Sequence, residues 1–559
     1  MSLPIKKNDS TPDDAAPDPE ASDRAMLGGN APALRAGEDP GAEELVESGV
    51  SPVGVAGVDV VAISPDAGAA SAEDQPLPGR WILTDAEIRP IILGVSTAMF
   101  IAALNQTVIA TALPTIGRDF HDFDNLSWLI TAYLLSSTIA GPLCGKLSDI
   151  YGRRLVMMSA LGVFVIGSIA CALAPNMLTL ILMRGLQGIG GGGIVPLVQA
   201  TVADAVAPRE RGRYQAYMGS VWIAAGILGP VIGGYIADHL HWSFVFWVNV
   251  PLGLGAAYII NRQLKRLPVN HRKHKLDLFG AALMMAAAIS LLLALTWGGV
   301  RYPWLSANIL LLVGIAVALT LAFAYRLAHE DEPFLPLAVL ANPVVRWGTA
   351  SASCAVSVSI GLTVFMPLYY ESVHHLSASD SGLALIPIAV MTTPGSILSG
   401  RIMLHFNRYK WMPMIGLICA VIALGLLAWR PAAPLWLVIS ALCVFGIGIG
   451  TVFSVATVSI QNAVSRFQVG TATGVMNFFR ALTSSLAVAI MGAIILSGLG
   501  HGNGKAVDVI AQLAASGTDL SGIFRWVFAA GVVFLLMSIG ALMLMEERPL
   551  RGRSEGVQK

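Results

Sequence analysis

Fourteen stretches of mostly apolar residues dominate this chain, and each is long enough to cross a lipid bilayer as a helix. A spanning helix needs about 20 mostly apolar residues. The stretches lie at 91–113, 127–148, 155–174, 176–204, 214–236, 244–262, 278–298, 306–327, 347–370, 382–403, 411–429, 434–459, 470–497 and 523–545. The sequence therefore predicts an all-α polytopic membrane protein with fourteen transmembrane helices.

Composition supports this class and separates an acidic tail from a basic membrane body. Of the 559 residues, 55% are apolar and 13% are charged, whereas about 25% are charged in soluble proteins. Residues 1–80 hold fifteen acidic and five basic side chains, and no aromatic residue precedes Trp81. We expect a disordered acidic N-terminal tail, regulatory or dispensable, because such a segment cannot bury a core. It lacks the apolar stretch of a signal peptide.

The distribution of lysine and arginine predicts the orientation. With both termini in the cytoplasm, the inner connections carry eighteen basic residues and the outer connections carry four. Cytoplasmic loops are enriched in these residues. We therefore expect a multi-pass protein of the bacterial cytoplasmic (inner) membrane with both termini inside.

A weak internal repeat predicts how the spans are grouped. The segment GGGGIVPLVQATVADAVAPRERGRYQAYMG (190–219) is similar to GIGIGTVFSVATVSIQNAVSRFQVGTATGVMN (446–477). Internal repeats are common in secondary transporters, with the binding site between the halves. We expect a six-helix bundle at 81–262, a linker with two inserted helices at 263–346, a second six-helix bundle at 347–545 and a cytoplasmic tail at 546–559.

Residues suited to covalent or metal chemistry are scarce. The five cysteines show no paired spacing and are expected to be small core residues. No Walker motif occurs, and Gly190 to Gly193 do not form a phosphate loop because no Lys-Ser/Thr follows them. We expect no enzyme activity, no metal, no nucleic-acid partner and no cofactor, which leaves the proton gradient as the energy source.

Two arginines lie inside predicted membrane helices without an acidic partner. Arg184 is about 12 Å from the outer face at 1.5 Å per residue, the same depth as Asn105. Gln187 follows Arg184 one turn later, and Arg480 lies in the segment 470–497. Arginine at membrane depth is costly and is a functional hypothesis by default, although a boundary error would let Arg184 reach the headgroups.

Five motifs resemble the fourteen-span drug:proton antiporter branch of the major facilitator superfamily. They are ALNQTVIATALPTI (103–116), GKLSDIYGRR (145–154), RGLQGIGGGG (184–193), GILGPVIGG (226–234) and WSFVFWVNVPLG (242–253). The resemblance implies the fold of two six-helix bundles with two inserted helices. It also implies a substrate or coupling site at Asn105, Gln106, Thr107, Arg184, Gln187 and Arg480. Asn105 departs from the branch, which usually has an aspartate there, and an asparagine carries no proton.

The same resemblance implies two conformational devices. A charge latch at the inner ends of the second and third spans is expected to comprise Gly145, Asp149, Gly152, Arg153, Arg154 and Asp204, with Gly145 and Gly152 framing a tight turn. A hinge in the fifth span is expected to comprise Gly226, Gly229, Pro230, Gly233 and Gly234, where missing side chains permit close helix packing. The alternatives are that the arginines only anchor the topology, and that the glycine helix packs closely without moving.

The predicted function is the export of amphiphilic small molecules by proton antiport through alternating access. Neutral or anionic substrates are favoured because no carboxylate lies deep in the apolar segments. A periplasmic adaptor protein is an additional candidate partner. The alternatives are a dedicated exporter of one metabolite or siderophore-like compound, a facilitator without proton coupling, and, more distantly, a membrane receptor or enzyme.

Overall fold

The computed structural model describes residues 85–122, 125–266, 277–299, 301–330, 333–376, 378–406, 408–498 and 520–550. The predicted acidic tail at 1–80 lies outside these residues, as do most of the basic connection at 263–277 and the end of the predicted C-terminal tail.

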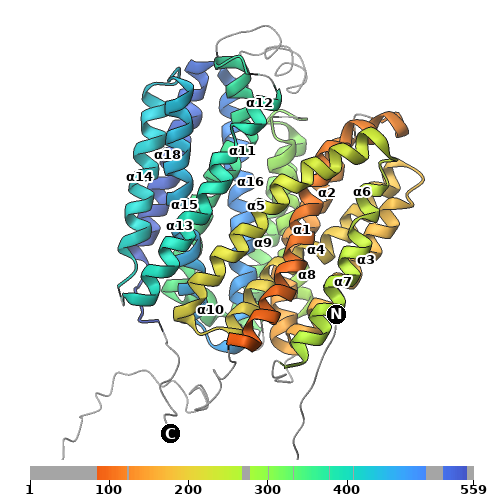
Figure 1. The fold of residues 1–559 in the computed structure, drawn as a ribbon, viewed down its shortest axis with the longest axis vertical. Coiled ribbons are helices and arrows are strands. Elements are labelled where there is room, and N and C mark those ends of the chain that lie inside the picture. Colours follow the sequence, from red (N-terminus) through yellow and green to blue (C-terminus); the bar gives the residue numbers. More distant parts are fainter. Residues whose placement is uncertain are drawn as a thin grey trace, which may run out of the picture. The chain divides into compact units, whose positions relative to one another are not determined.

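Fourteen helical spans in the described residues are long and apolar enough to cross a membrane, which confirms the predicted number and the all-α class (Figure 1). They are α1 (Asp85–Phe120), α2 (Leu126–Tyr151), α3 (Arg153–Ala172), α4 (Met177–Ala205), α5 (Pro208–His239), α6 (Phe244–Trp247) with α7 (Asn249–Gln263), α8 (Leu278–Trp297), α9 (Ala307–His329), α11 (Pro343–Val373), α12 (Ala378–Leu383) with α13 (Ile386–His405), α14 (Trp411–Trp429), α15 (Leu435–Ala463), α16 (Val469–Gly498) and α18 (Ser521–Leu544). A short α10 (Leu337–Ala341) precedes α11.

Two predicted spans are interrupted rather than continuous. The sixth is divided between α6 and α7, and the tenth between α12 and α13. Pro251 lies in the first turn of α7 and Pro387 in the first turn of α13. Proline has no N–H to donate to the preceding turn, so it is tolerated in the first turn of a helix but not in its interior. The two prolines therefore favour the start of a separate helix.

Side chains close several helix starts by accepting hydrogen bonds from unpaired backbone N–H groups. Asn176 accepts from Thr179 N at 2.9 Å before α4, and Asn342 accepts from Val344 N at 3.0 Å before α11. Asp277 accepts from Gly280 N at 2.8 Å before α8. Such caps typically contribute about 1 kcal/mol each.

The glycine run in α4 brings that helix against two neighbours. A Cβ at Gly188 or Gly192 would overlap the backbone of α2 at Tyr133 or Ser137, and one at Gly190 would overlap α3 at Phe164. Helix association in lipid depends on close packing and on polar contacts, since the lipid tails are as apolar as the side chains. The run is thus a packing surface, and it fixes α4 between α2 and α3.

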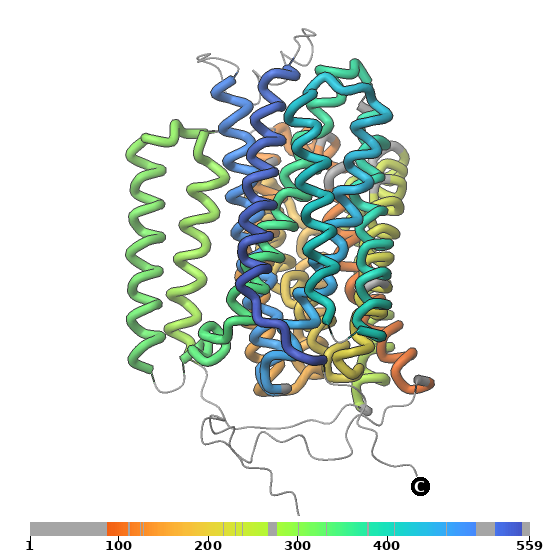
Figure 2. Tube along the Cα trace, turned by 90° about the vertical axis from the view of Figure 1, so that its left-hand side faces the viewer, coloured from red at the N-terminus to blue at the C-terminus, as the bar shows by residue number. Residues whose placement is uncertain are grey.

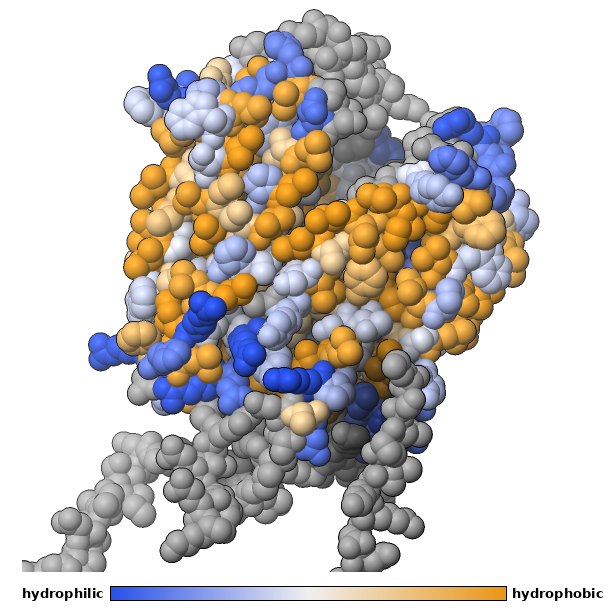
Figure 3. All heavy atoms as spheres, viewed as in Figure 1, coloured by the Kyte–Doolittle hydropathy of each residue, from blue (hydrophilic) through white to orange (hydrophobic). Residues whose placement is uncertain are grey.

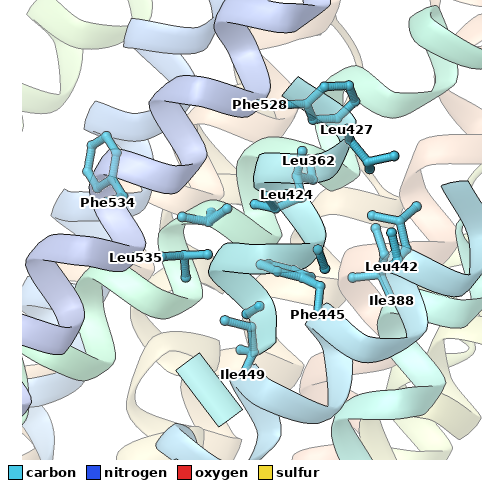
Figure 4. Close-up of a cluster of buried hydrophobic side chains, with 14 of the residues drawn as sticks. Leu362, Ile388, Leu424, Leu427, Leu442, Phe445, Ile449, Phe528, Phe534 and Leu535 are labelled. Carbon is cyan, nitrogen blue, oxygen red and sulfur yellow. The ribbon is translucent and has the colours of Figure 1, made fainter. Parts of the chain in front are cut away.

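We call α1–α7 the N-half, α11–α18 the C-half, and the end where α2 meets α3, at the bottom of Figure 1, the Gly152 end. Buried apolar side chains form two clusters within the N-half and one large cluster within the C-half. Figure 4 shows part of the C-half cluster, in which Leu424, Phe445 and Phe528 come from α14, α15 and α18. The exact bundle limits at 81–262 and 347–545 remain a prediction.

The inserted helices α8 and α9 pack against each other and stand beside α16 (Figure 2). Asp277 fastens this pair at the Gly152 end, because it caps α8 and also accepts a hydrogen bond from Arg326 Nε of α9 at 2.9 Å. Burial alone would raise the pKa of Asp277, but the Gly280 N–H and the Arg326 guanidinium outweigh it and lower that pKa. Sequence reasoning missed this pair.

Candidate functional site

A buried polar network surrounds Arg184 in the N-half. Its Nη1 donates to Gln187 Oε1 at 2.5 Å and to Asn105 Oδ1 at 3.4 Å, and its Nε donates to the Leu129 carbonyl at 3.1 Å. Arg184 and Asn105 are each 1% exposed. The two residues predicted to share a depth are therefore in contact.

Asn105 is the acceptor on which this network converges. Its Oδ1 also accepts from Gln187 Nε2 at 3.2 Å and from Asn249 Nδ2 at 3.1 Å. Gln187 Nε2 donates in addition to Ser168 Oγ at 2.6 Å. Side chains of α1, α3, α4 and α7 thus meet at one point, and Asn249 and Ser168 are members that the sequence did not reveal.

The guanidinium of Arg184 is surrounded by neutral hydrogen-bond acceptors and aromatic rings. Within the described ranges, no acidic side chain forms an ion pair with it. Its guanidinium lies 4.4 Å from the ring centroid of Tyr133 and 5.9 Å from that of Phe246. A desolvated cation–π contact contributes about 2 kcal/mol, and hydrogen bonds to a charged group about 1.5–3 kcal/mol each. The site therefore keeps a positive potential that a carboxylate at position 105 would cancel.

Arg480 is separate from this network. It lies on α16 in the C-half, is half-buried, and has its guanidinium carbon 5.2 Å from the ring centroid of Phe453 on α15. Within the part of the chain that the structure describes, no ion pair involves it. The two arginines predicted for one site thus lie on different halves.

Gln106 and Thr107, the other predicted site residues of the first span, lie on α1, which packs against α5. Thr107 Oγ1 lies 3.0 Å from the carbonyl of Ala225 on α5, and Gln106 is exposed. A Cβ at Gly229 would overlap Thr107, whereas one at Gly226 or Gly234 would meet open space. Close packing through the fifth-span glycines therefore occurs at Gly229 and not at Gly226 or Gly234. Gly233 is buried, and α5 continues through position 230.

A second, charged cluster lies at the Gly152 end. Arg153 Nε donates to Asp204 Oδ2 at 2.7 Å, and Arg153 Nη1 donates to Asp149 Oδ1 at 2.6 Å. Asp149 then accepts from Gly470 N at 3.0 Å and from Thr471 N at 2.7 Å. Because those two N–H groups belong to the first turn of α16, the carboxylate faces the positive end of that helix.

Asp149 thereby links the two halves, and glycines allow the approach. A Cβ at Gly145 would overlap the backbone of Gly470, and one at Gly212 of α5 would overlap Gly400 of α13. Gly145 lies inside α2, so the predicted turn belongs to Gly152 alone. Gly152 has a φ of 88°, a conformation that side-chain-bearing residues rarely adopt.

Arg154 does not join this cluster. Its Nη2 donates to Asn261 Oδ1 of α7 at 2.6 Å, and its Nε donates to the same oxygen at 3.0 Å. Arg154 thus contacts α7 rather than Asp149 or Asp204, because neighbouring residues at a helix start point to different sides, and its predicted part in the latch stays a prediction.

A neutral polar bridge lies beside the charged cluster. Asn477 Nδ2 of α16 donates to Gln199 Oε1 of α4 at 2.8 Å, and Gln461 Nε2 of α15 donates to the Gln199 carbonyl at 3.3 Å. These residues connect the halves and were not predicted. The available signal was an amide side chain in each of three apolar segments.

Comparison with known proteins identifies the architecture. The family model described as Major Facilitator Superfamily matches residues 95–488. The chain belongs to the Major Facilitator Superfamily. It is a multi-pass membrane transporter that acts on small molecules, and membership confirms the family that the motifs resembled.

Two relatives and one solved structure illustrate the similarity. The chain is 33% identical to the multidrug transporter protein MdtP of Bacillus subtilis, over 72% of this chain and 74% of that protein. It is 33% identical to the efflux pump FUS6 of Gibberella fujikuroi, over 78% of this chain and 82% of that protein. The structure of the proton:xylose symporter XylE is 15% identical, covers 83% of this chain and 96% of that chain, and has a TM-score of 0.55, which shows a common fold.

Proposed function

We propose that the protein is a secondary active exporter of amphiphilic small molecules that couples export to proton entry and alternates access between the two membrane faces. The names of the relatives support export, since they include a multidrug transporter and an efflux pump. The contact between the halves at the Gly152 end supports the alternating-access part of the proposal, because it is a place where the two halves could separate.

The Gly152 end is assigned to the cytoplasm. The bias of eighteen basic residues on this side against four on the other supports the assignment. The contact between Asp149 and the start of α16 then closes the cytoplasmic side between the halves in this conformation. Glycine backbones, hydrogen bonds and an apolar cluster that joins Ala200 and Ala203 of α4 to Ile460 of α15 and Val469 of α16 form this closure.

Arg153 and Asp149 act as the latch of this closure. The positive start of α16 and Arg153 both stabilise the Asp149 carboxylate, so opening removes a charge-assisted contact. One proton moving across 100 mV supplies about 2.3 kcal/mol, which is of the size needed to open such a contact. Asp149→Asn keeps one acceptor oxygen but loses the charge, and we expect it to shift the population toward cytoplasmic opening.

The substrate class follows from the unbalanced positive charge of Arg184 and Arg480. Neutral or anionic amphiphiles are favoured over dications because no described acidic side chain pairs with either arginine. Cells that express the transporter can be challenged with quaternary dications and, in parallel, with anionic or neutral toxins. Protection confined to dications would contradict this substrate class.

Proton coupling is tested most directly at position 105. Transport is measured in proteoliposomes with an imposed pH gradient, with wild type and Asn105→Asp compared. An aspartate next to Arg184 adds a titratable group at the convergence point of the network, so the variant should gain pH dependence. Gln106→Glu provides the comparison, because it adds a carboxylate at the adjacent exposed residue rather than at the oxygen on which the network converges. The same pH profile in wild type and Asn105→Asp would reject a role for position 105.

A facilitator without proton coupling, or a dedicated exporter of one metabolite, is the second candidate. Asn105 favours it, because the amide occupies the centre of the polar network and does not titrate. Export that is unchanged when the pH gradient is collapsed would select this alternative.

A further inference from the structure

A groove opens between α1 and α5 toward the Gly152 end. The two helices touch near Thr107, whose Oγ1 reaches the Ala225 carbonyl at 3.0 Å. Toward their starts, an open groove of about 400 Å³ lies between the two helices. Its lining includes Arg89 and Arg213 together with Tyr214 and Tyr217.

The lining changes from charged to apolar with depth in the membrane. Arg89 and Arg213 lie about 4 Å and about 8 Å from the first residues of their spans at 1.5 Å per residue. Leu93 and Tyr217 lie about one turn deeper and are 67% and 46% exposed, and Val221 lies deeper still. Figure 3 shows the same order on this face, with hydrophilic residues gathered at the lower end below a hydrophobic band.

Among the residues that the structure describes, the charged side chains lining the groove are those of Arg89 and Arg213, and no acidic side chain lines it. Glu87 and Glu210 lie on the same helices but do not line it. Basic pockets between helices at a membrane surface are suited to anionic lipid headgroups, and tyrosine is favoured at the same level because it has an apolar ring and a polar tip.

We propose that this groove is a binding site for one anionic phospholipid of the leaflet at the Gly152 end. Arg89 and Arg213 contact the phosphate, the tyrosine hydroxyls lie at the level of the glycerol backbone, and the acyl chains follow Leu93 and Val221 between the helices. The order of charged, amphipathic and apolar residues along α1 and α5 matches the order of those parts in a phospholipid.

The experiment measures lipid binding to purified full-length protein in detergent by native mass spectrometry. Dioleoyl phosphatidylglycerol is compared with dioleoyl phosphatidylcholine, which has the same chains and no net charge, and with glycerol 3-phosphate, the headgroup chemistry alone. The test variant is Arg89→Gln with Arg213→Gln. The control is Arg408→Gln, an exposed arginine at the same end that does not line the groove.

We expect one high-affinity phosphatidylglycerol on the wild type and on Arg408→Gln. The double variant should bind it about thirtyfold more weakly, since each basic residue near the surface contributes about fivefold. Phosphatidylcholine binding should be equal in all three proteins, which also shows that the double variant is folded. Glycerol 3-phosphate should not bind, because it lacks the acyl chains.

Three results would overturn the proposal. The first is equal affinity of wild type for the two lipids. The second is an unchanged phosphatidylglycerol affinity in the double variant. The third is binding of glycerol 3-phosphate as tight as that of the lipid, which would identify a site for soluble phosphates instead.

Discussion

Arg153 and Arg184 are both buried arginines of the N-half, but their partners differ in kind. Arg153 is held by two carboxylates, one of which also contacts the C-half. Arg184 is held by amide and carbonyl oxygens of its own half. Removing a partner from a charge pair leaves a buried charge, whereas the amide side chains around Arg184 carry N–H donors as well as acceptor oxygens and can bond to one another. The Arg153 cluster is therefore suited to a contact that forms or breaks when the two halves move relative to each other. The Arg184 network is suited to holding a positive charge at a fixed place within the N-half.

The largest effect is expected from removing Arg153. In Arg153→Met, Asp149 and Asp204 lose their shared partner, and removing one member of a buried ion pair costs about 3–5 kcal/mol. We expect a lower unfolding midpoint in detergent and at least a tenfold loss of transport. Arg154→Met is the matched control, because its partner Asn261 is neutral and both residues belong to the N-half. Equal losses of stability and transport in Arg153→Met and Arg154→Met would show that pairing with Asp149 and Asp204 does not make Arg153 more important than Arg154.

A smaller loss of stability is expected at Arg184. In Arg184→Met the amides remain paired, since Gln187 Nε2 already donates to Asn105 Oδ1. The free energy of unfolding should fall by about 1–2 kcal/mol, less than at Arg153, because the cost of burying the guanidinium offsets most of what its contacts contribute. Chemical denaturation of both variants in the same detergent gives the comparison. A loss at Arg184 as large as that at Arg153 would contradict the distinction between neutral and charged partners.

The smallest effect is expected at Asp277, a carboxylate outside the spans whose partner Arg326 is 30% exposed. Its pKa is lowered in the folded protein from an ordinary value of 3.8. The stabilisation is therefore present at neutral pH and is lost as the pH falls below about 3.8 through the folded pKa. Asp277→Asn should cost about 1 kcal/mol at pH 7, the range of partly exposed pairs.

Unfolding midpoints from pH 7 to pH 3 check this prediction. The difference between wild type and Asp277→Asn should shrink toward the acid end of the series. Glu330→Gln removes the other carboxylate on Arg326, at 3.0 Å and 40% exposed, and should change stability by less than about 0.5 kcal/mol. A difference at Asp277 that is constant with pH would exclude the carboxylate as its source.

The sequence indicated some of the buried polar contacts and did not reveal those whose partners come from distant segments. Arg184 and Asn105 share a depth that follows from residue counts along two apolar segments, and they are in contact. Arg153 and Arg154 are alike in sequence, and only the helix start decides that one faces Asp204 and the other Asn261. Asn249, Gln199 and Asn477 lie in apolar segments with no local sign of the residues they meet.

The sequence by itself determined the fourteen spans and the superfamily, because both depend on local properties of the chain. The length of an apolar segment decides whether it can span a bilayer, and each motif is a short run of residues. The tertiary structure decided which buried groups share a hydrogen bond and which glycines face a neighbouring helix. Those outcomes depend on the rotation of each helix about its axis and on how closely its neighbours approach. Both are set by the packing of the whole assembly of helices rather than by any one segment.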